Sequence, residues 1–473
     1  MNRRKFFKNG ALFTTGSILL NPLDGFANSE KEIFQEFNNK KAKNIIFLVS
    51  DGMSSGTLNM ADVFLSRKNG VGSNWINLYR ENLVSRALMD MASANSIVTD
   101  SAAASSSWGG GKRVNNGSLN IGVNGEEYLP ILQKFKKAGK KVGCVTTVPI
   151  THATPAGFSV YAKSRYSQEI IAEMYLDLEF DVMMGGGDEY FNSNERKDKK
   201  DVYEGFSKKG YDVVKNRADM FKSYNNENKI LAVFNKGTLP YSIDRENDEV
   251  LKNTTPTLSE MTKIAIKKMK SNKNGFVLQV EAGKVDWAAH ANDSAGLIYD
   301  QIAFDEAVKV AMEFAKEDKE TLVIITSDHG NANPGLIYGK NANDHFDNMR
   351  NFKATNEKIL GSFSNQNSVK DVIDIIKNYN NIEISIEDAQ SILSYYSGIE
   401  KEDGIYNYKK LPTQKFADIQ TKHNSIGWIG NEHSSDFTEL AMYGPGSESL
   451  KPFMKNTDLH TFMLQVAEVE DKF

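Results

Sequence analysis

The chain has 473 residues, of which 40% are hydrophobic and 25% charged, ordinary proportions for a globular protein. The formal net charge is −4 and becomes −7 without the four basic residues and one acidic residue of positions 1–27, which argues against a nucleic-acid-binding protein. Cys144 is the only cysteine, so an internal disulfide is excluded.

Residues 1–27 have the pattern of a twin-arginine export signal. Arg3 and Arg4 precede a mildly apolar run at 11–20, which is too short to span a bilayer. The small residue Ala27 marks the predicted cleavage site. We therefore expect a periplasmic or secreted protein without a membrane span in its mature form; a disordered basic start is the alternative.

Strand and helix patterns alternate along the chain. Continuous apolar runs predict buried, mostly parallel strands at residues 44–52, 141–148, 180–187, 275–283 and 321–330. Amphipathic patterns predict helices at residues 126–140, 167–180, 258–270 and 296–317. This order predicts an α/β fold, a doubly wound three-layer α/β/α sandwich with a mostly parallel central sheet. Ligands of such sheets bind at the carboxyl ends of the strands.

The alternation stops after the last of these strands. Residues 28–473 are therefore expected to form one domain that carries a crown-like insertion at about 331–420. Helices are expected inside it at 369–379 and 385–398, while 404–427 reads as irregular. A shorter polar stretch, residues 188–210, is expected to be a surface excursion.

Acidic residues and histidines follow the ends of the predicted strands. In "VEAGKVDWAAH", Glu281 ends a strand, and Asp286 and His290 are spaced to share one face of a helical turn as half of a zinc-type site. Alone, this spacing is more typical of a solvated helix face. In "IITSDHGN", Asp328 and His329 suit a metal, although a turn explains the pair equally well.

Two further motifs complete the set. Asp51 in "FLVSDGMS" ends the first strand, where an Asp-Gly pair is also common turn chemistry. His433 in "NEHSSD" precedes an apolar strand, and a lone histidine of this kind is usually structural. Together, these carboxylates and histidines suit two borderline metals that share Asp51, with a harder oxygen-only site that uses Glu281. Two-metal centres recur in enzymes that displace phosphoryl groups.

The stretch "SIVTDSAAASSSWGGG", residues 96–111, contains the candidate nucleophile. No histidine accompanies Ser101 locally, so a nearby divalent cation is expected to hold its oxygen as an alkoxide. The small residues after it predict a helix start that faces an incoming anion. Farther on, Arg165 suits two phosphoryl oxygens, Asp100 could orient it, and Thr154 could supply an oxygen to the third metal.

The motifs "SDGM", "VTDSAAAS", "THATPAG…SR", "MMGGG", "VEAGKVDWAAH", "SDHG" and "NEH" stand in the order found in alkaline phosphatases, and the chain resembles this family over about residues 43–330 and 420–470. The resemblance implies hydrolysis of phosphate monoesters through a phosphoserine at Ser101, with release of inorganic phosphate and an alcohol. It implies Arg165 as the phosphate clamp, and a homodimer as the assembly.

The same resemblance implies two Zn²⁺ and one Mg²⁺ per subunit. One zinc would be bound by Asp286, His290 and His433. The other zinc, beside Ser101, would be bound by Asp51, Asp328 and His329. Magnesium would be bound by Asp51, Thr154 and Glu281.

Two positions near the phosphate depart from some bacterial members of the family. His152 and Trp287 stand where those proteins carry Asp and Lys. His152 gives the third site a nitrogen neighbour, which puts strict occupancy by magnesium in doubt. Trp287 removes a cation from the surroundings of the phosphate, so product phosphate is expected to bind more weakly.

Alternative functions remain open from the sequence. A phosphodiesterase or sulfatase of the same superfamily is the closest, although a serine nucleophile with Arg165 favours a doubly charged monoester. A non-catalytic phosphate-binding protein is the alternative of another class. His345, His423 and His460 lie outside the motifs, and no catalytic part is expected for them.

Overall fold

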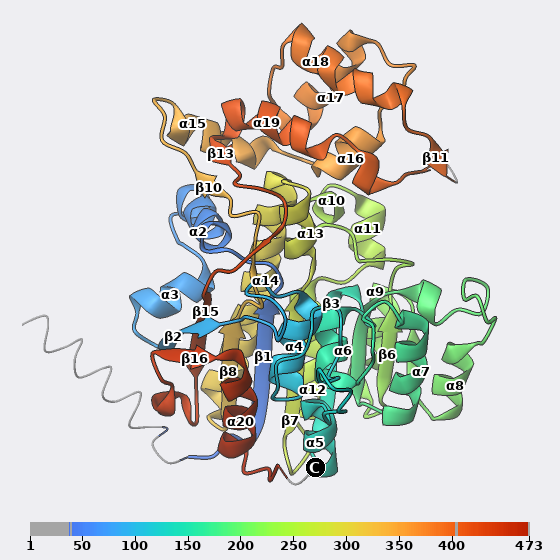
Figure 1. Cartoon of the computed structure of the whole chain (residues 1–473), viewed down its shortest axis with the longest axis vertical. Helices are drawn as coiled ribbons and strands as arrows, with labels where there is room; N and C mark the ends of the chain where they lie inside the picture. Colours follow the sequence, from blue (N-terminus) through green and yellow to red (C-terminus); the bar gives the residue numbers. More distant parts are fainter. Residues whose placement is uncertain (1–36, 38–39, 403–404, 472–473) are drawn as a thin grey trace, which may run out of the picture.

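Ten strands form one sheet through the centre of the molecule, in the order β16-β2-β15-β8-β1-β7-β3-β4-β6-β5 (Figure 1). The computed structural model describes residue 37 and residues 40–402 and 405–471. The five central strands are mutually parallel and lie where the apolar runs predict them. They are β8 (Thr321–Thr326), β1 (Asn44–Ser50), β7 (Phe276–Ala282), β3 (Lys141–Pro149) and β4 (Val182–Gly186).

The outer strands are short or only partly buried, and four of them went unpredicted. Of the ten strands, only β15 runs antiparallel to its neighbours. Beyond β4 lie β6 (Ile230–Val233) and β5 (Asp212–Val214). Beyond β8 lie β15 (Thr438–Tyr443), β2 (Ser85–Asp90) and β16 (Phe453–Lys455). The expected mostly parallel sheet is confirmed, with β15 as the apolar strand expected after His433.

Helices cover both faces of the sheet because successive side chains of each strand point to opposite sides. In β1, Ile46 and Leu48 belong to one apolar cluster, while Phe47 and Val49 belong to the other. The first cluster includes residues of α2 (Ser55–Asn69), α12 (Leu258–Met269) and α14 (Ser294–Asp318). The second includes residues of α4 (Ser101–Gly109), α5 (Ile131–Lys137), α6 (Ala153–Ser159), α7 (Gln168–Leu178) and α20 (Asn456–Val466). The three-layer sandwich is therefore confirmed.

Several shorter helices connect the longer elements. They are α3 (Asn74–Arg80), α8 (Val202–Lys208), α9 (Arg217–Lys222), α10 (Ser242–Glu246), α11 (Glu249–Thr254) and α13 (Lys284–His290). The helix expected at 126–140 begins only at Ile131, because Pro130 occupies its N-cap and residue Glu127 forms a β-bridge with Ile121. The stretch 188–210, expected as a surface excursion, contains α8.

Residues 335–427 form a group of helices above the sheet, which we call the crown segment (Figure 1). Its helices are α15 (Ala342–Asp347), α16 (Asn356–Gly361), α17 (Val369–Asn380), α18 (Ile386–Leu393) and α19 (Thr413–Asn424). The ends of the segment meet in a small antiparallel ladder between β10 (Gly335–Leu336) and β13 (Ile426–Gly427). Two short antiparallel strands of two residues each, β11 (Lys401–Glu402) and β12 (Ile405–Tyr406), precede α19.

The expectation of irregular structure at 404–427 is wrong for its second half. The helix α19 buries Phe416, Ala417 and Ile419 against the rest of the crown segment, although its sequence has only a weak apolar stripe. Burial against neighbouring helices outweighs local propensity in such a segment. The helices expected at 369–379 and 385–398 are present as α17 and α18.

The predicted export signal at residues 1–27 lies outside the described residues. In the part of the chain that the structure describes, no helix combines the length and the apolar character needed to cross a membrane.

Candidate active site and metal centre

Three neighbouring strands deliver acidic residues to one edge of the sheet. Asp51 follows β1 directly, Asp328 and His329 follow β8, and Glu281 is the next-to-last residue of β7. Because β8, β1 and β7 are adjacent and parallel, their carboxyl ends meet at the same place. The site therefore lies where the sequence predicts it.

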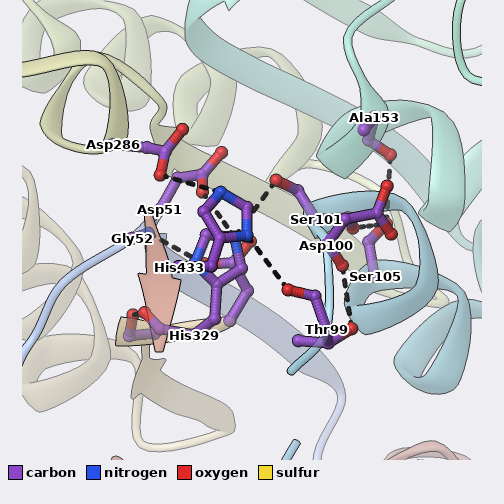
Figure 2. A network of polar contacts seen from close by, with 12 residues as sticks. Asp51, Gly52, Thr99, Asp100, Ser101, Ser105, Ala153, Asp286, His329 and His433 are labelled. Carbon is purple, nitrogen blue, oxygen red and sulfur yellow. Dashed lines mark hydrogen bonds and ion pairs between the residues drawn. The ribbon is translucent and has the colours of Figure 1, made fainter. Parts of the chain in front are cut away.

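Ser101 reaches this edge from the first position of α4. Asp100 caps the helix by accepting a hydrogen bond from the backbone N–H of Ala103 at 2.9 Å. The Ser101 hydroxyl lies 3.3 Å from Nε2 of His329 and points into the cluster of acids and histidines (Figure 2). The histidine missing from its local sequence thus comes from the end of a distant strand.

Close packing of α4 against α6 fixes Ser101 relative to Thr154 and His152. The Ser105 hydroxyl donates to the carbonyl oxygen of Ala153 at 3.0 Å, and a Cβ atom on Gly157 would lie 2.1 Å from that hydroxyl. The small residues after Ser101 are therefore required for contact between the two helices, and all of α4 is buried.

The first group of possible ligands is wholly buried around Ser101. His329 Nε2 lies 3.4 Å from Asp51 Oδ1 and 3.3 Å from Asp328 Oδ2. One ligand atom from each of the three residues lies within 4.8 Å of the others. A divalent cation held there would contact the Ser101 oxygen. We call Asp51, Asp328 and His329 the inner group.

The second group is open to solvent. Asp286 and His290 occupy one face of α13, and His433 lies on β14 (His433–Ser434). The histidine Nε2 atoms are 3.1 Å apart, and Asp286 carboxylate oxygens lie 3.4 Å from His290 and 3.5 Å from His433. The His290 side chain is 35% exposed. We call these three residues the outer group.

The third group joins Asp51 and Glu281 with a nitrogen ligand. His152 Nδ1 lies 3.9 Å from Glu281 Oε1, and the three residues satisfy the same 4.8 Å distance criterion. The buried hydroxyl of Thr154 has no hydrogen-bond partner among the described residues. His152 therefore belongs to the cluster itself, whereas the sequence predicts an oxygen-only site with His152 merely nearby.

All three histidines of the inner and outer groups turn the same nitrogen inward. Nδ1 of His290 lies 2.7 Å from the carbonyl oxygen of Asn431, and Nδ1 of His433 lies 3.0 Å from that of Thr99. Nδ1 of His329 likewise faces the Gly330 carbonyl at 3.2 Å. Since a carbonyl oxygen only accepts a hydrogen bond, Nδ1 carries the proton and donates it in that bond, and Nε2 keeps its lone pair for a metal.

The electrostatics of the cluster favour bound cations. Within the described part of the chain, both carboxylate oxygens of Asp51 are buried without a hydrogen-bond partner. Burial and the neighbouring charges of Asp328, Asp286 and Glu281 raise the pKa of Asp51 well above its usual value. Burial raises the pKa of Asp328 to about 7 and lowers that of His329 well below its usual value. Divalent cations would compensate these buried carboxylates, so the residues present fit metal ions.

Asp286 differs because three imidazoles face it. Burial acts to raise the pKa of this carboxyl, but His290, His433 and His329 outweigh it and lower the pKa below the usual value. Asn331 Nδ2 also donates to Asp286 Oδ1 at 2.7 Å. Asp286 is thereby held ionised and oriented toward the outer group.

Arg165 lies where it can bind an anion beside Ser101. Its Nη1 donates to Asp100 Oδ2 at 3.0 Å, and its Nη2 lies 3.1 Å from Nε2 of His152. Burial acts to lower the pKa of the guanidinium, and Asp100 outweighs this effect and raises it. The sequence expectation that Asp100 orients Arg165 thus agrees with this contact.

Several contributing residues were not singled out as candidates from the sequence. Asn331 orients Asp286, and the Thr146 hydroxyl donates to Glu281 Oε2. Carbonyl groups of Thr99 and Asn431 fix histidine tautomers. Asn331, Thr99 and Asn431 lie within recognised motifs, but their roles depend on contacts between distant segments, which the motifs do not encode.

Trp287 and the three remaining histidines lie outside the ligand groups of the described residues. Trp287 stacks on Tyr408, and Nζ of Lys284 lies 5.2 Å from its ring. His460 is buried with Nδ1 2.7 Å from the Trp108 carbonyl, and His345 faces Ser425 in the crown segment.

Comparisons with known proteins point to one family over most of the chain. The profile of the family described as alkaline phosphatase matches residues 42–469. Alkaline phosphatase 4 of Bacillus subtilis (strain 168) is 31% identical over 448 residues, which cover 93% of this chain and 91% of that protein. Alkaline phosphatase 3 of the same organism is 31% identical over 434 residues, which cover 89% of this chain and 88% of that protein.

Solved structures show the same similarity. The alkaline phosphatase of Thermus thermophilus superposes with a TM-score of 0.84 at 28% identity, covering 97% of this chain and 96% of its own. The cold-active enzyme of a Shewanella species has the same fold, with a TM-score of 0.76 at 23% identity over 90% of this chain and 99% of its own.

Proposed function

Because the chain belongs to the alkaline phosphatase family and is therefore a phosphomonoester hydrolase, we propose that it works through a phosphoserine at Ser101. The observation that carries this proposal is the position of the Ser101 hydroxyl. It lies at the first residue of a helix and against the inner group (Figure 2), and the preceding residue, Asp100, accepts a hydrogen bond from Arg165 at 3.0 Å.

In the first step, the Ser101 oxygen attacks phosphorus and the bond from phosphorus to the leaving alcohol oxygen breaks. Arg165 holds the nonbridging oxygens of the phosphoryl group, where negative charge must be stabilised in the transition state. Asp100 keeps the guanidinium in place through its 3.0 Å contact. In the second step, water attacks the phosphoserine, the bond from phosphorus to the Ser101 oxygen breaks, and inorganic phosphate is released.

Bound divalent cations would supply Lewis acidity at the serine and leaving oxygens and would lower the pKa of the attacking water. The family is metal-dependent, and the three ligand groups fit such ions. We assign one zinc to the outer group, Asp286, His290 and His433. A second zinc belongs to the inner group, Asp51, Asp328 and His329. Magnesium or another divalent metal belongs with Asp51, Glu281, Thr154 and His152.

The mechanism is tested by measuring the activity and the metal content of two serine variants and comparing both with the wild type. Ser101→Ala is expected to lower kcat on p-nitrophenyl phosphate by at least about a thousandfold, because the covalent step is lost. Its metal content should stay near that of the wild type. Ser107→Ala, a buried serine of the same helix whose hydroxyl bonds only to the Ala103 carbonyl, is the matched control and should keep its activity. Unchanged hydrolysis by Ser101→Ala with retained metal would make the covalent mechanism untenable.

Substrate charge separates this function from its closest alternative. Arg165 and two cations face a group with several free oxygens, which favours a monoester dianion over a diester or sulfate. Turnover of p-nitrophenyl phosphate should therefore exceed that of bis-p-nitrophenyl phosphate and p-nitrophenyl sulfate. Faster cleavage of the diester or the sulfate would contradict the proposal, and no turnover of any of the three would favour a phosphate-binding protein.

Export and assembly are part of the same proposal. The paired Arg3 and Arg4 before an apolar run support export by the twin-arginine route to the periplasm or the medium. The crown segment is proposed as the family's variable insertion, and the assembly as a homodimer. Light scattering on the purified enzyme would measure the assembly directly.

A further inference from the structure

Of the inner and outer groups, the outer group is the more exposed to solvent. Asp51, Asp328 and His329 of the inner group are at most 1% exposed, whereas His290 of the outer group is 35% exposed. A phosphoryl group at Ser101 must therefore carry its ester oxygen, and the organic group attached to it, past His290. The side chains around His290 decide what that organic group meets.

Trp287 is the other partly exposed residue on α13, where the remaining side chains between Lys284 and Ala289 are buried. The core fixes its indole from one side, because Nζ of Lys284 lies 5.2 Å from the Trp287 ring and 3.5 Å from the Tyr241 ring. The same ammonium donates to the Thr238 hydroxyl at 3.1 Å. Trp287 is thus held in place before any ligand binds.

Tyr408 covers Trp287 from the crown segment. The two rings are nearly parallel, with centroids 5.8 Å apart and planes 16° apart. Tyr408 is 40% exposed, so ring surface remains open beside the contact. Trp287 directly follows Asp286 of the outer group in α13, so its stacking contact places Tyr408 beside that group.

We infer that Trp287 and Tyr408 form an aromatic platform for the leaving group, and that Tyr408 is a specificity-determining residue for phosphate esters of nucleosides. The inference rests on the phosphoserine function proposed above. A planar base stacks on aromatic side chains with about 1–3 kcal/mol per base, whereas a sugar or a small alcohol has no such face. Trp287 and Tyr408 already stack on each other in the absence of a ligand, so binding of a base does not have to order these two side chains.

Two substrates with the same leaving oxygen isolate this contact. Adenosine 5′-monophosphate and ribose 5-phosphate both release a primary 5′-alcohol, so their chemical steps are matched and they differ in the base. The metal-loaded wild-type enzyme should have a higher kcat/KM for the nucleotide. In Tyr408→Ala the ratio of the two kcat/KM values should fall about 5-fold, corresponding to about 1 kcal/mol of stacking.

Two further variants separate stacking from other effects. Tyr408→Phe keeps the ring and should keep the ratio. Tyr395→Ala removes a tyrosine of similar exposure, 46%, from another part of the crown segment and should leave the ratio unchanged. An unchanged ratio in Tyr408→Ala, or an equal fall in Tyr408→Phe, would overturn the inference.

The two proposals fail in different ways. Hydrolysis of both esters that depends on Ser101, with a ratio insensitive to Tyr408→Ala, would leave the phosphoserine function standing and remove the platform. Ser101-independent hydrolysis would remove the phosphoserine function, and the platform inference with it.

Discussion

Asn331, the last residue of "IITSDHGN", shows how one side chain can orient a proposed metal ligand. It is fully buried, and its Nδ2 fixes one oxygen of Asp286 at 2.7 Å while leaving the carboxylate directed at two histidines. It also lies opposite His433 in the ladder between β9 (Gly330–Asn331) and β14. Asn331 thereby orients Asp286 and lies beside His433, and both of these residues belong to the outer group.

Asn331→Ala is therefore expected to weaken metal binding at the outer group by about 10–100-fold, the usual effect of removing a residue that orients a ligand. Competition with a chromogenic zinc chelator measures this affinity. Asn380→Ala removes another fully buried asparagine, in the crown segment, and should leave zinc affinity unchanged. Equal loss in both variants would show that general destabilisation is responsible.

Trp287 leads to a second prediction for a single residue. Nearby Lys284 is buried and bonded to Thr238, so it supplies no free ammonium to the phosphate. Trp287→Lys introduces one, and a surface attraction of about 1 kcal/mol would lower the inhibition constant for inorganic phosphate roughly 5-fold. Trp287→Leu, without a charge, is the comparison. Equal phosphate inhibition in the two variants would mean that this position does not control product release.

Helix α14 works as an anchor for several loops. Three buried aspartates along it accept backbone N–H groups from other segments. Asp293 binds Asn356 at the start of α16, Asp300 binds Ser242 at the start of α10, and Asp305 binds Trp75 in α3. Burial raises the pKa of Asp293 and Asp300 to about 7 and that of Asp305 to about 6.

These values predict how stability depends on pH. Because the folded pKa exceeds the unfolded one, the folded state binds more protons between about pH 4 and pH 7, and the free energy of unfolding falls as pH rises through that window. Asp300→Asn keeps an oxygen acceptor for Ser242 but cannot ionise. Its urea midpoint should fall less between pH 5 and pH 7 than that of the wild type. Glu313→Gln, exposed on the same helix, should behave like the wild type.

The contact between α4 and α6 predicts a cost for one added methyl group. Gly157→Ala would place a Cβ atom 2.1 Å from Ser105 Oγ, so the helices must separate, at a cost of about 1–3 kcal/mol. Activity should fall as well, since Ser101 begins α4. Gly361→Ala, in α16, meets no atom within 4 Å and should be neutral or stabilising. Urea unfolding of the two variants makes the comparison.

For the molecule as a whole, the sequence predicts what is buried or carries a motif. The central strands were found because they are continuous apolar runs, and Asp51, Asp286 and His329 because they follow strands with recognisable spacing. The outer strand β2 was missed because its side chains alternate between buried and exposed, and α19 because only its neighbours explain its burial. The contact of Tyr408 with Trp287 depends on how the crown segment folds back, which no local pattern encodes.

Metal removal should destabilise the whole enzyme. Asp51, Asp328 and Glu281 are fully buried at the carboxyl ends of three adjacent strands. Without cations, their negative charges repel one another. A chelator should lower Tm at pH 8 by several degrees or more, and added zinc and magnesium should restore it. An unchanged Tm after complete metal loss would mean that the cluster is stable without ions.

The ladder that closes the crown segment has a consequence for how such an enzyme can change over time. The chain leaves the sheet edge through β9 and β10 and returns through β13 and β14. These strands pair with each other, so the two ends of the crown segment are held together beside His433. Because the closure is local, the segment between β10 and β13 can be lengthened, shortened or exchanged while the ligands keep their places. Tyr408 belongs to that replaceable part. Preference for a leaving group can then diverge among descendants while the bond-breaking machinery is inherited intact.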